Sequence, residues 1–256
     1  MSASFVLFET HNQIAALTLN RPERHNSLVP EFLREILNAL EGLGQQAELR
    51  ALVLQANGRS FSTGGDVRAF FDHREHLEAY ASEIVGVLNQ VVVAMVGLPM
   101  PVIAAVQGIV TGGSIGLVLA SDLVLLAPEA GFTPYYSVVG FSPDGGWTAM
   151  LPELIGLKRV REILMLNQTI TAEQAVQWGL ANRIVAADRI RDEAWAVGLS
   201  IAQKKWGSIR RSKRLLWRDT NAFAARLEEE RRQFLQQIVT PEARQGMEMF
   251  LHRRSP

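Results

Sequence analysis

An α/β fold followed by a helical C-terminal region is predicted by the order of hydrophobic patterns along the chain. Short apolar runs typical of strands alternate with segments of helical periodicity through the first 195 residues. Such alternation indicates helices packed on a sheet. From Ala149 onward the periodicity is almost entirely helical, with a short exception at Val185-Ala186. We therefore predict an α/β core over residues 1–195 and a helical region over residues 196–256.

The composition is that of an ordinary globular protein without electrostatic bias. The 256 residues are 48% hydrophobic and 20% charged, and 26 Lys and Arg balance 26 Asp and Glu. A chain without net charge offers no overall attraction to nucleic acid or to a membrane surface. The sequence has no cysteine, which excludes disulfides, a thiol nucleophile and cysteine-ligated metals. Its first residues lack the pattern of a secretory signal, so we expect a cytoplasmic protein.

Periodicity places the first regular elements. A turn at His11-Asn12 separates two strand-like runs, and Pro30 suits the first turn of a helix. The expected elements are strands over residues 5–9, 14–20 and 51–55, a helix beginning near Pro30, and a long helix over residues 76–98.

Three charged stretches each have two interpretations. The loop at residues 20–26, which contains Arg24, either meets an anionic ligand or is solvated. Residues 72–76 contain two histidines, but their carboxylate spacing is typical of a solvated loop, and we expect no metal site. Residues 204–218 hold seven Lys or Arg and two tryptophans, a composition found in nucleic-acid-binding segments. We interpret them instead as the exposed face of a helix, balanced by the acidic residues 228–230.

Three glycine-rich turns carry the chemical interest of the sequence. The first, FSTGGD (residues 61–66), ends in Asp66, which is placed to cap the following helix. The second is TGGS (residues 111–114). The third, GFSPDGGW (residues 140–147), is the one with a carboxylate, Asp144, embedded in it.

The second turn lies within an apolar stretch, residues 101–126, around which we expect the core to form. Its length and breaks predict a buried strand, a turn, a buried helix and a strand. A transmembrane span is the competing interpretation, but glycines, Gln107 and Asp122 interrupt the run. A helix that begins at Gly112-Gly113 presents free N–H groups and a positive dipole end, which bind a phosphate or an oxyanion. The alternative is that these glycines only permit close packing.

The order and spacing of the three turns resemble the enoyl-CoA hydratase/isomerase (crotonase) superfamily. The resemblance extends over nearly the whole chain. Further matching segments are Asn20-Arg21-Pro22 with Asn26-Ser27-Leu28, Thr171-Ala172-Glu173-Gln174-Ala175 through Trp178-Gly179-Leu180, and Gln245-Gly246 to Phe250 with Arg253 and Pro256.

The resemblance implies a spiral of ββα repeats with a C-terminal helical region that lines the active site and builds trimers or dimers of trimers. It implies an acyl-CoA thioester substrate, with coenzyme A as part of the substrate and no other cofactor. Two backbone N–H groups of the family stabilise an enolate, and on this sequence they fall at Ser62 and Gly113. The other substrate-binding positions are Arg24, Gly64, Asp66, Gly112, Tyr136 and Trp147.

Departures from the family pattern concern the reaction. Hydratases of this superfamily carry two catalytic glutamates, and here Gly116 and Tyr136 stand in their places. We therefore do not expect ordinary hydratase activity. The run Pro-Asp-Gly-Gly-Trp resembles isomerases of phenylacetate catabolism, whose acid–base is the aspartate at this turn, although Trp147-Thr148 reverses their order.

Asp144 is accordingly the expected acid–base of an enoyl-CoA isomerase, since one carboxylate suffices to move a proton. Three alternatives remain open. Asp144 only caps a helix beginning at Gly145; or it is a nucleophile, as in the dehalogenase branch; or the protein binds acyl-CoA without catalysis. The aromatic residues Tyr135, Tyr136, Phe141 and Trp147 form either an apolar pocket or part of the core.

Overall fold

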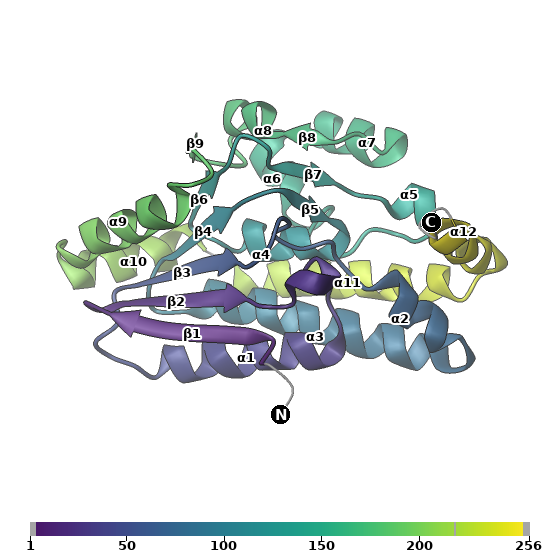
Figure 1. Ribbon diagram of the computed structural model, residues 1–256, viewed down its shortest axis with the longest axis horizontal. Coiled ribbons are helices and arrows are strands. Elements are labelled where there is room, and N and C mark those ends of the chain that lie inside the picture. The colour runs from purple at the N-terminus through teal and green to yellow at the C-terminus, as the bar shows by residue number, and fades with distance from the viewer. Residues whose placement is uncertain (1–3, 218, 253–256) are drawn as a thin grey trace.

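A six-stranded sheet forms the centre of the fold in the computed structural model, which describes residues 4–217 and 219–252 (Figure 1). Its order is β1-β2-β3-β4-β6-β9; β1 and β2 are antiparallel and the other neighbours parallel. A second sheet has the order β5-β7-β8. The strands are β1 (Val6–His11), β2 (Ile14–Leu19), β3 (Ala51–Ala56), β4 (Val102–Val106), β5 (Ile109–Thr111), β6 (Leu123–Leu126), β7 (Gly131–Thr133), β8 (Ile170–Thr171) and β9 (Arg183–Ile184).

Helices cover both faces of the central sheet. On one face α1 (Pro30–Gly44), α3 (Leu77–Gly97) and α11 (Thr220–Ile238) lie side by side, and α9 (Ile190–Ala202) covers the other (Figure 1). The remaining helices are α2 (Val67–Asp72), α4 (Ile115–Leu119), α5 (Tyr136–Val139), α6 (Leu151–Ile155), α7 (Leu157–Leu166), α8 (Ala172–Trp178), α10 (Trp206–Leu216) and α12 (Pro241–His252), with 3-10 turns η1 (Pro22–Arg24), η2 (Arg74–His76) and η3 (Gly112–Ser114).

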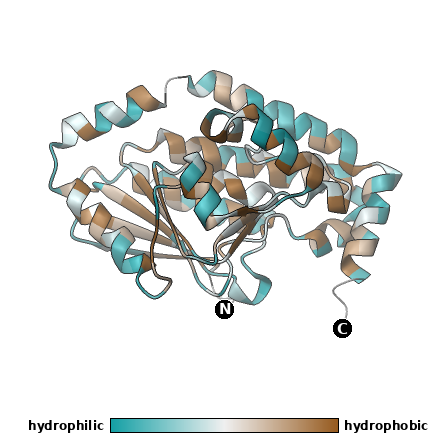
Figure 2. Cartoon of the chain, turned by 90° about the horizontal axis from the view of Figure 1, so that it is seen from above, coloured by the Kyte–Doolittle hydropathy of each residue, from teal (hydrophilic) through white to brown (hydrophobic). Residues whose placement is uncertain are grey.

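The inner strands β2, β3 and β4 are almost entirely apolar because both of their faces are buried, whereas the edge strand β1 is mostly exposed. In β2, Ala15 and Leu17 face the core formed with α1 and α3, whereas Ile14 and Ala16 face the smaller core beneath α9. In Figure 2 the central strands are accordingly hydrophobic, and the surrounding helices alternate hydrophobic and hydrophilic residues. Residues 74–97 have the length and composition of a membrane span, but half of that segment is buried, and α3 packs between α1 and α11.

The structure confirms the long elements and corrects several short ones. The stretch 101–126 forms β4, η3, α4 and β6 as predicted, with the unpredicted strand β5 inserted before η3. The short exception to the helical pattern at Val185-Ala186 directly follows a strand, β9, and the strands β7, β8 and β9 are not predicted by the sequence. No helix begins at Gly145, since turns occupy residues 145–150 and α6 starts only at Leu151. Arg253 and Pro256 lie outside the described residues.

Two residues predicted to lie on solvated faces are buried. Lys213, within the basic stretch of α10, is 6% exposed and donates to Asp122 Oδ2 at 2.8 Å and to the carbonyl oxygens of Met95 and Met100. Glu230, within the acidic run of α11, is 4% exposed. Both charges are buried with hydrogen-bond partners, as buried charges must be.

Candidate active site

A cavity of about 330 Å³ opens where the three glycine-rich turns meet. Of the site residues predicted from the sequence, six line it: Arg24, Asp66, Gly112, Gly113, Tyr136 and Asp144. The other three, Ser62, Gly64 and Trp147, do not line it. The fold therefore brings together residues of all three glycine-rich turns, with two carboxylates and an arginine, at a single concave site.

The second turn reaches the cavity because β5 leads directly into η3 and α4. Gly112 has a φ of +53°, a conformation that favours glycine. Gly113 follows in the first turn, where its N–H has no acceptor within the helix. A Cβ on Gly113 would lie 2.8 Å from both Asp144 Oδ1 and Leu88 Cδ2. Glycine at position 113 thus lets the Asp144 carboxylate lie directly beside a free backbone donor.

Ser62 does not supply the second backbone donor, so this part of the sequence prediction is wrong. Its N–H donates to the Ile109 carbonyl oxygen at 3.3 Å, and its Oγ donates to the Asn26 carbonyl oxygen at 2.7 Å. Ser62 is fully buried and forms a bridge to Val110 of β5. Its polar groups therefore join the first turn to the second sheet.

Gly65, three residues later, has the properties expected of that donor. It lines the cavity, and its N–H makes no hydrogen bond to any residue that the structure describes. The flanking groups are fixed, because Leu28 N–H donates to Gly64 O at 2.7 Å and Asp66 N–H donates to Leu28 O at 3.0 Å. Gly64 itself permits close packing: its Cβ would lie 2.4 Å from Thr111 O.

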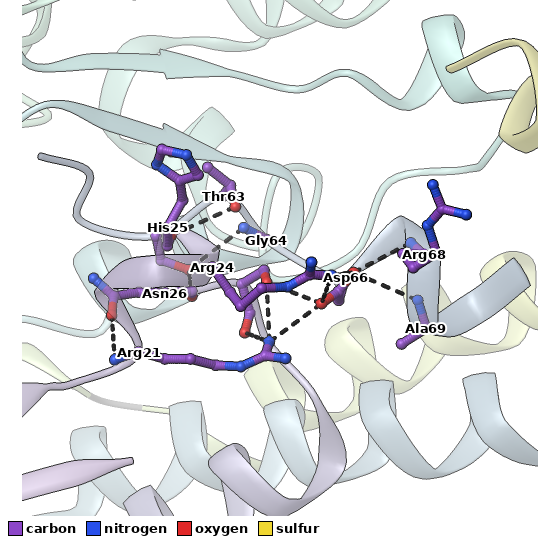
Figure 3. A network of polar contacts seen from close by, with 11 residues as sticks. Arg21, Arg24, His25, Asn26, Thr63, Gly64, Asp66, Arg68 and Ala69 are labelled. Atoms are coloured by element: carbon purple, nitrogen blue, oxygen red, sulfur yellow. Dashed lines mark hydrogen bonds and ion pairs between the residues drawn. The ribbon is translucent and has the colours of Figure 1, made fainter. Parts of the chain in front are cut away.

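Asp66 organises the rim of the cavity (Figure 3). Its Oδ1 accepts from Arg68 N–H at 3.2 Å and Ala69 N–H at 3.4 Å, which confirms the predicted helix cap. Arg21 and Arg24 form ion pairs with it at 3.2 and 3.0 Å. Burial opposes ionisation, but Arg24 and Arg21 outweigh it and hold the pKa of Asp66 below its usual value. The Arg24 side chain remains 47% exposed, so it is accessible to an anionic ligand.

Asp144 is a buried carboxylate with one oxygen engaged. The Tyr136 hydroxyl donates to Oδ1 at 2.5 Å and to the Asp144 carbonyl oxygen at 3.1 Å. Asp144 lines the cavity, and its Oδ2 makes no hydrogen bond to the described residues. Burial raises the pKa of Asp144 to about 7; the Tyr136 hydrogen bond opposes this rise and the charge of Glu230 adds to it. Burial and the neighbouring Asp144 raise the pKa of Tyr136 well above 10, so the phenol remains the donor.

The position of the missing hydratase glutamate is filled by main chain. A Cβ on Gly116 would lie 2.8 Å from the Gly145 carbonyl oxygen and 2.9 Å from Val92 Cγ2. Gly145, with a φ of +64°, is equally close to the second turn, since its Cβ would lie 2.2 Å from Gly113 O. The third turn therefore packs directly on η3 and α4, which leaves no room for a side chain at position 116.

Glu230 caps the third turn, a role that one interpretation gave to Asp144. Its carboxylate accepts hydrogen bonds from the N–H groups of Gly146, Thr148 and Ala149 at 2.6 to 2.9 Å. The capping interpretation of Asp144 is therefore wrong. The sequence does contain a signal for the burial of Glu230, because the buried Leu227 and Phe234 lie three residues before and four residues after it on α11.

Trp147 is a core residue, contrary to its predicted contact with substrate. It is fully buried, and its Nε1 donates to the Gly112 carbonyl oxygen at 2.9 Å, which fixes the second turn. The aromatic lining comes instead from Tyr135, Tyr136, Phe70, Phe141, Phe234 and Phe250. Phe70, Phe141 and Phe234 pack together with ring centroids 5.4 to 6.0 Å apart.

No cluster of three or more His, Asp or Glu that could hold a metal ion occurs within residues 4–217 and 219–252. Of the two histidines in the charged loop, His73 stacks on Tyr80 at 4.2 Å between ring centroids. Its Nδ1 lies 2.8 Å from the Ala69 carbonyl oxygen, so the ring is held against α2 and α3.

Comparisons with known proteins agree on one family. A family model described as enoyl-CoA hydratase/isomerase matches residues 9–256. The 1,2-epoxyphenylacetyl-CoA isomerase of Escherichia coli is 30% identical over 98% of this chain and 97% of its own. A probable enoyl-CoA hydratase of Mycobacterium leprae is 28% identical over 100% and 98%. The crystal structure of an enoyl-CoA hydratase from Bacillus halodurans has the same fold, with a TM-score of 0.90, 24% identity, and coverage of 96% of this chain and 100% of that chain.

Proposed function

The chain belongs to the enoyl-CoA hydratase/isomerase (crotonase) family, and we propose that it is an enoyl-CoA isomerase with Asp144 as its acid–base. One observation carries the proposal: the buried Asp144 carboxylate adjoins Gly113, whereas the hydratase glutamate positions hold Gly116 and Tyr136. Gly116 has no side chain, and the Tyr136 hydroxyl is engaged with Asp144. One carboxylate beside a backbone donor is suited to proton transfer within the acyl chain.

The proposed reaction moves a double bond by one carbon. The thioester oxygen accepts hydrogen bonds from the Gly65 and Gly113 N–H groups, which stabilise the negative charge that develops on it. Asp144 Oδ2 removes a proton from C2 of a 3-enoyl thioester, which gives a dienolate. The same carboxyl returns a proton to C4, so the C2–H bond is lost, a C4–H bond forms, and the double bond moves from C3–C4 to C2–C3.

The environment of Asp144 suits both steps. A pKa of about 7 makes the carboxylate a stronger base than an exposed aspartate, and it keeps the protonated form available as an acid at neutral pH. Tyr136 holds Oδ1, which leaves Oδ2 for substrate. A hydratase must in addition bind and activate water, and the glutamate pair that does so in the family is missing.

The aromatic lining supports a cyclic or aromatic acyl group. Phe70, Phe141 and Phe234 form one apolar wall of the cavity, and the E. coli relative is named for 1,2-epoxyphenylacetyl-CoA. We accordingly propose a role in phenylacetate catabolism or a related pathway, in the cytoplasm. The half-exposed Arg24 at the rim supports the proposal that it binds an anionic part of coenzyme A. No metal or redox cofactor is needed, and the helical region, residues 196–256, forms a trimer or a dimer of trimers.

The test is a panel of unsaturated and aryl acyl-CoA esters incubated with the protein in deuterated water, with products followed by mass. Conversion of 3-enoyl to 2-enoyl esters, with hydration of crotonyl-CoA near background, is the expected result. Rapid formation of 3-hydroxybutyryl-CoA would show a hydratase. Tight binding of the esters without exchange of their C2 or C4 protons would show a binding protein, and a covalent ester trapped on Asp144 would show a nucleophile.

A further inference from the structure

Glu230, in the middle of α11, is a buried carboxylate that does not line the cavity. Its Oε1 accepts from Thr148 N–H at 2.6 Å, Thr148 Oγ1 at 2.7 Å and Ala149 N–H at 2.9 Å, and its Oε2 accepts from Gly146 N–H at 2.7 Å. All of these donors lie two to five residues after Asp144. A carboxylate that is only 4% exposed needs such partners to remain charged.

The turn after Asp144 requires an acceptor from elsewhere in the fold. Met150 and Leu151 N–H groups donate to Gly146 O, and Trp147 N–H donates to Asp144 O at 3.5 Å. The N–H groups of Gly146, Thr148 and Ala149 have no acceptor within the turn, as at a helix start. Asp144 is the nearest acceptor in sequence, yet its Oδ1 accepts from Tyr136. Glu230 therefore performs the capping and leaves the Asp144 carboxylate for the cavity.

The opposite side of the same turn is fixed by close main-chain packing. A Cβ on Gly145 would lie 2.2 Å from Gly113 O, and a Cβ on Gly116 would lie 2.8 Å from Gly145 O. Asp144 thus precedes a segment held between η3 and α4 on one side and α11 on the other. A displacement at the α11 side moves the carboxylate relative to the Gly113 N–H.

We propose that Glu230 is a positioning residue for Asp144: its hydrogen bonds fix the turn, and its negative charge acts on the Asp144 carboxyl. The inference rests on the proposed function. Two ionisable groups act directly on Asp144, namely Tyr136 from α5, which lowers its pKa, and Glu230 from α11, which raises it. The η3–α4 segment contributes none, and at the rim Arg24 and Asp66 are paired with each other.

The experiment compares Glu230→Gln with Glu229→Gln, a control on the adjacent exposed position of α11. Turnover of trans-3-hexenoyl-CoA is measured against pH, together with melting temperature. In Glu230→Gln one amide donor faces the N–H groups of the turn, so we expect kcat to fall by up to roughly 100-fold, the loss that a displacement of about 1 Å can cause, with KM little changed. The acid limb of the profile should also move to lower pH, because a negative charge that raises the pKa of Asp144 is gone. Glu229→Gln should match the wild type in both respects.

Glu230→Asp separates the two effects. It keeps the charge but shortens the reach, so kcat should fall while the acid limb stays near its wild-type pH. A folded Glu230→Gln protein with wild-type kcat and an unmoved acid limb would overturn the proposal, and so would a loss of kcat with no movement of the limb.

Should Glu230→Gln fail to fold, Thr148→Val takes its place, because it removes one of the four donors at an exposed position. A several-fold loss of kcat supports the proposal, and unchanged kcat overturns it. Asp144→Asn is assayed in parallel: its normal turnover would refute the proposed function itself, whereas an inactive Asp144→Asn with a normal Glu230→Gln refutes only the role of Glu230.

Discussion

Replacing Tyr136 with phenylalanine should move the pH dependence of catalysis upward. The Tyr136 hydroxyl donates to Asp144 Oδ1 at 2.5 Å and stabilises the charged carboxylate. A hydrogen bond to a charged group contributes about 1.5–3 kcal/mol. Since about 1.4 kcal/mol corresponds to one pKa unit, its loss should raise the pKa of Asp144 from about 7 to roughly 8–9.

The assay is the pH profile of kcat/KM for 3-enoyl-CoA isomerisation, which reports the free enzyme. The active form carries the carboxylate, so the rate rises with pH through the pKa of Asp144. At pH 7 about half of the wild type is active, and Tyr136→Phe should be slower by roughly 5–50-fold, with most of the loss recovered above pH 9. This shift is opposite in direction to that expected for Glu230→Gln.

Tyr135→Phe is the matched control, because Tyr135 also lines the cavity but its hydroxyl makes no hydrogen bond to Asp144. Its acid limb should coincide with that of the wild type. An acid limb in Tyr136→Phe that stays in place, or that moves to lower pH, would refute the assignment of the phenol as the group that stabilises the Asp144 carboxylate.

Three further perturbations test neighbouring parts of the site. The folded state holds the Asp144 proton up to about pH 7, whereas the unfolded chain releases it near 3.8. Burial of this carboxylate therefore destabilises the fold progressively between these pH values and fully above pH 7. The free energy of unfolding of Asp144→Asn should accordingly exceed that of the wild type by an amount that grows from pH 5 to pH 8 and reaches the order of a few kcal/mol. Gly116→Ala should lose about 1–3 kcal/mol of folding free energy in urea titrations, because its Cβ meets the Gly145 carbonyl oxygen at 2.8 Å, and wild-type stability would contradict the close packing of the third turn. Gly65→Pro and Gly113→Pro each remove one backbone donor and should slow proton exchange at C2 by roughly 10²–10³-fold; a folded variant with normal exchange would show that the N–H group removed does not bind the thioester oxygen.

The fold was largely predictable because its long elements have strong periodicity. The continuous apolar runs of β2, β3 and β4 reflect burial on both faces, and the helices over residues 30–44 and 77–97 have long apolar faces. The short strands β5, β7, β8 and β9 have two or three residues each. A period-two pattern cannot be recognised over so few residues.

The site was predictable where glycine and a carboxylate define it. The two glycine turns can be recognised directly in the sequence, whereas the meeting of Gly113 and Asp144 at one site is what the family resemblance implies. The close packing that brings the turns together needs glycine. The error at Ser62 has a local cause: its N–H direction depends on the bridge to β5, which the sequence pattern did not reveal.

The roles of Trp147 and Glu230 depend on tertiary packing. Trp147 follows two glycines of positive φ, and the resulting turn directs its ring into the core, where Nε1 meets Gly112 O. Glu230 lies 82 residues beyond Thr148 in the chain. Three consecutive acidic residues predict a solvated face when only the local sequence is considered. The packing of α11 on the third turn is what distinguishes the buried Glu230 from its exposed neighbours Glu228 and Glu229.

The central claim is that Asp144 transfers the proton, and the most direct measurement is the rate of 3-enoyl-CoA isomerisation by Asp144→Asn. Asparagine keeps the size of the side chain and still accepts a hydrogen bond from Tyr136, so the cavity and acyl-CoA affinity should change little. The rate should fall by roughly 10²–10⁴-fold, the usual contribution of a general acid–base. A variant that binds acyl-CoA normally and isomerises it at the wild-type rate would contradict the account.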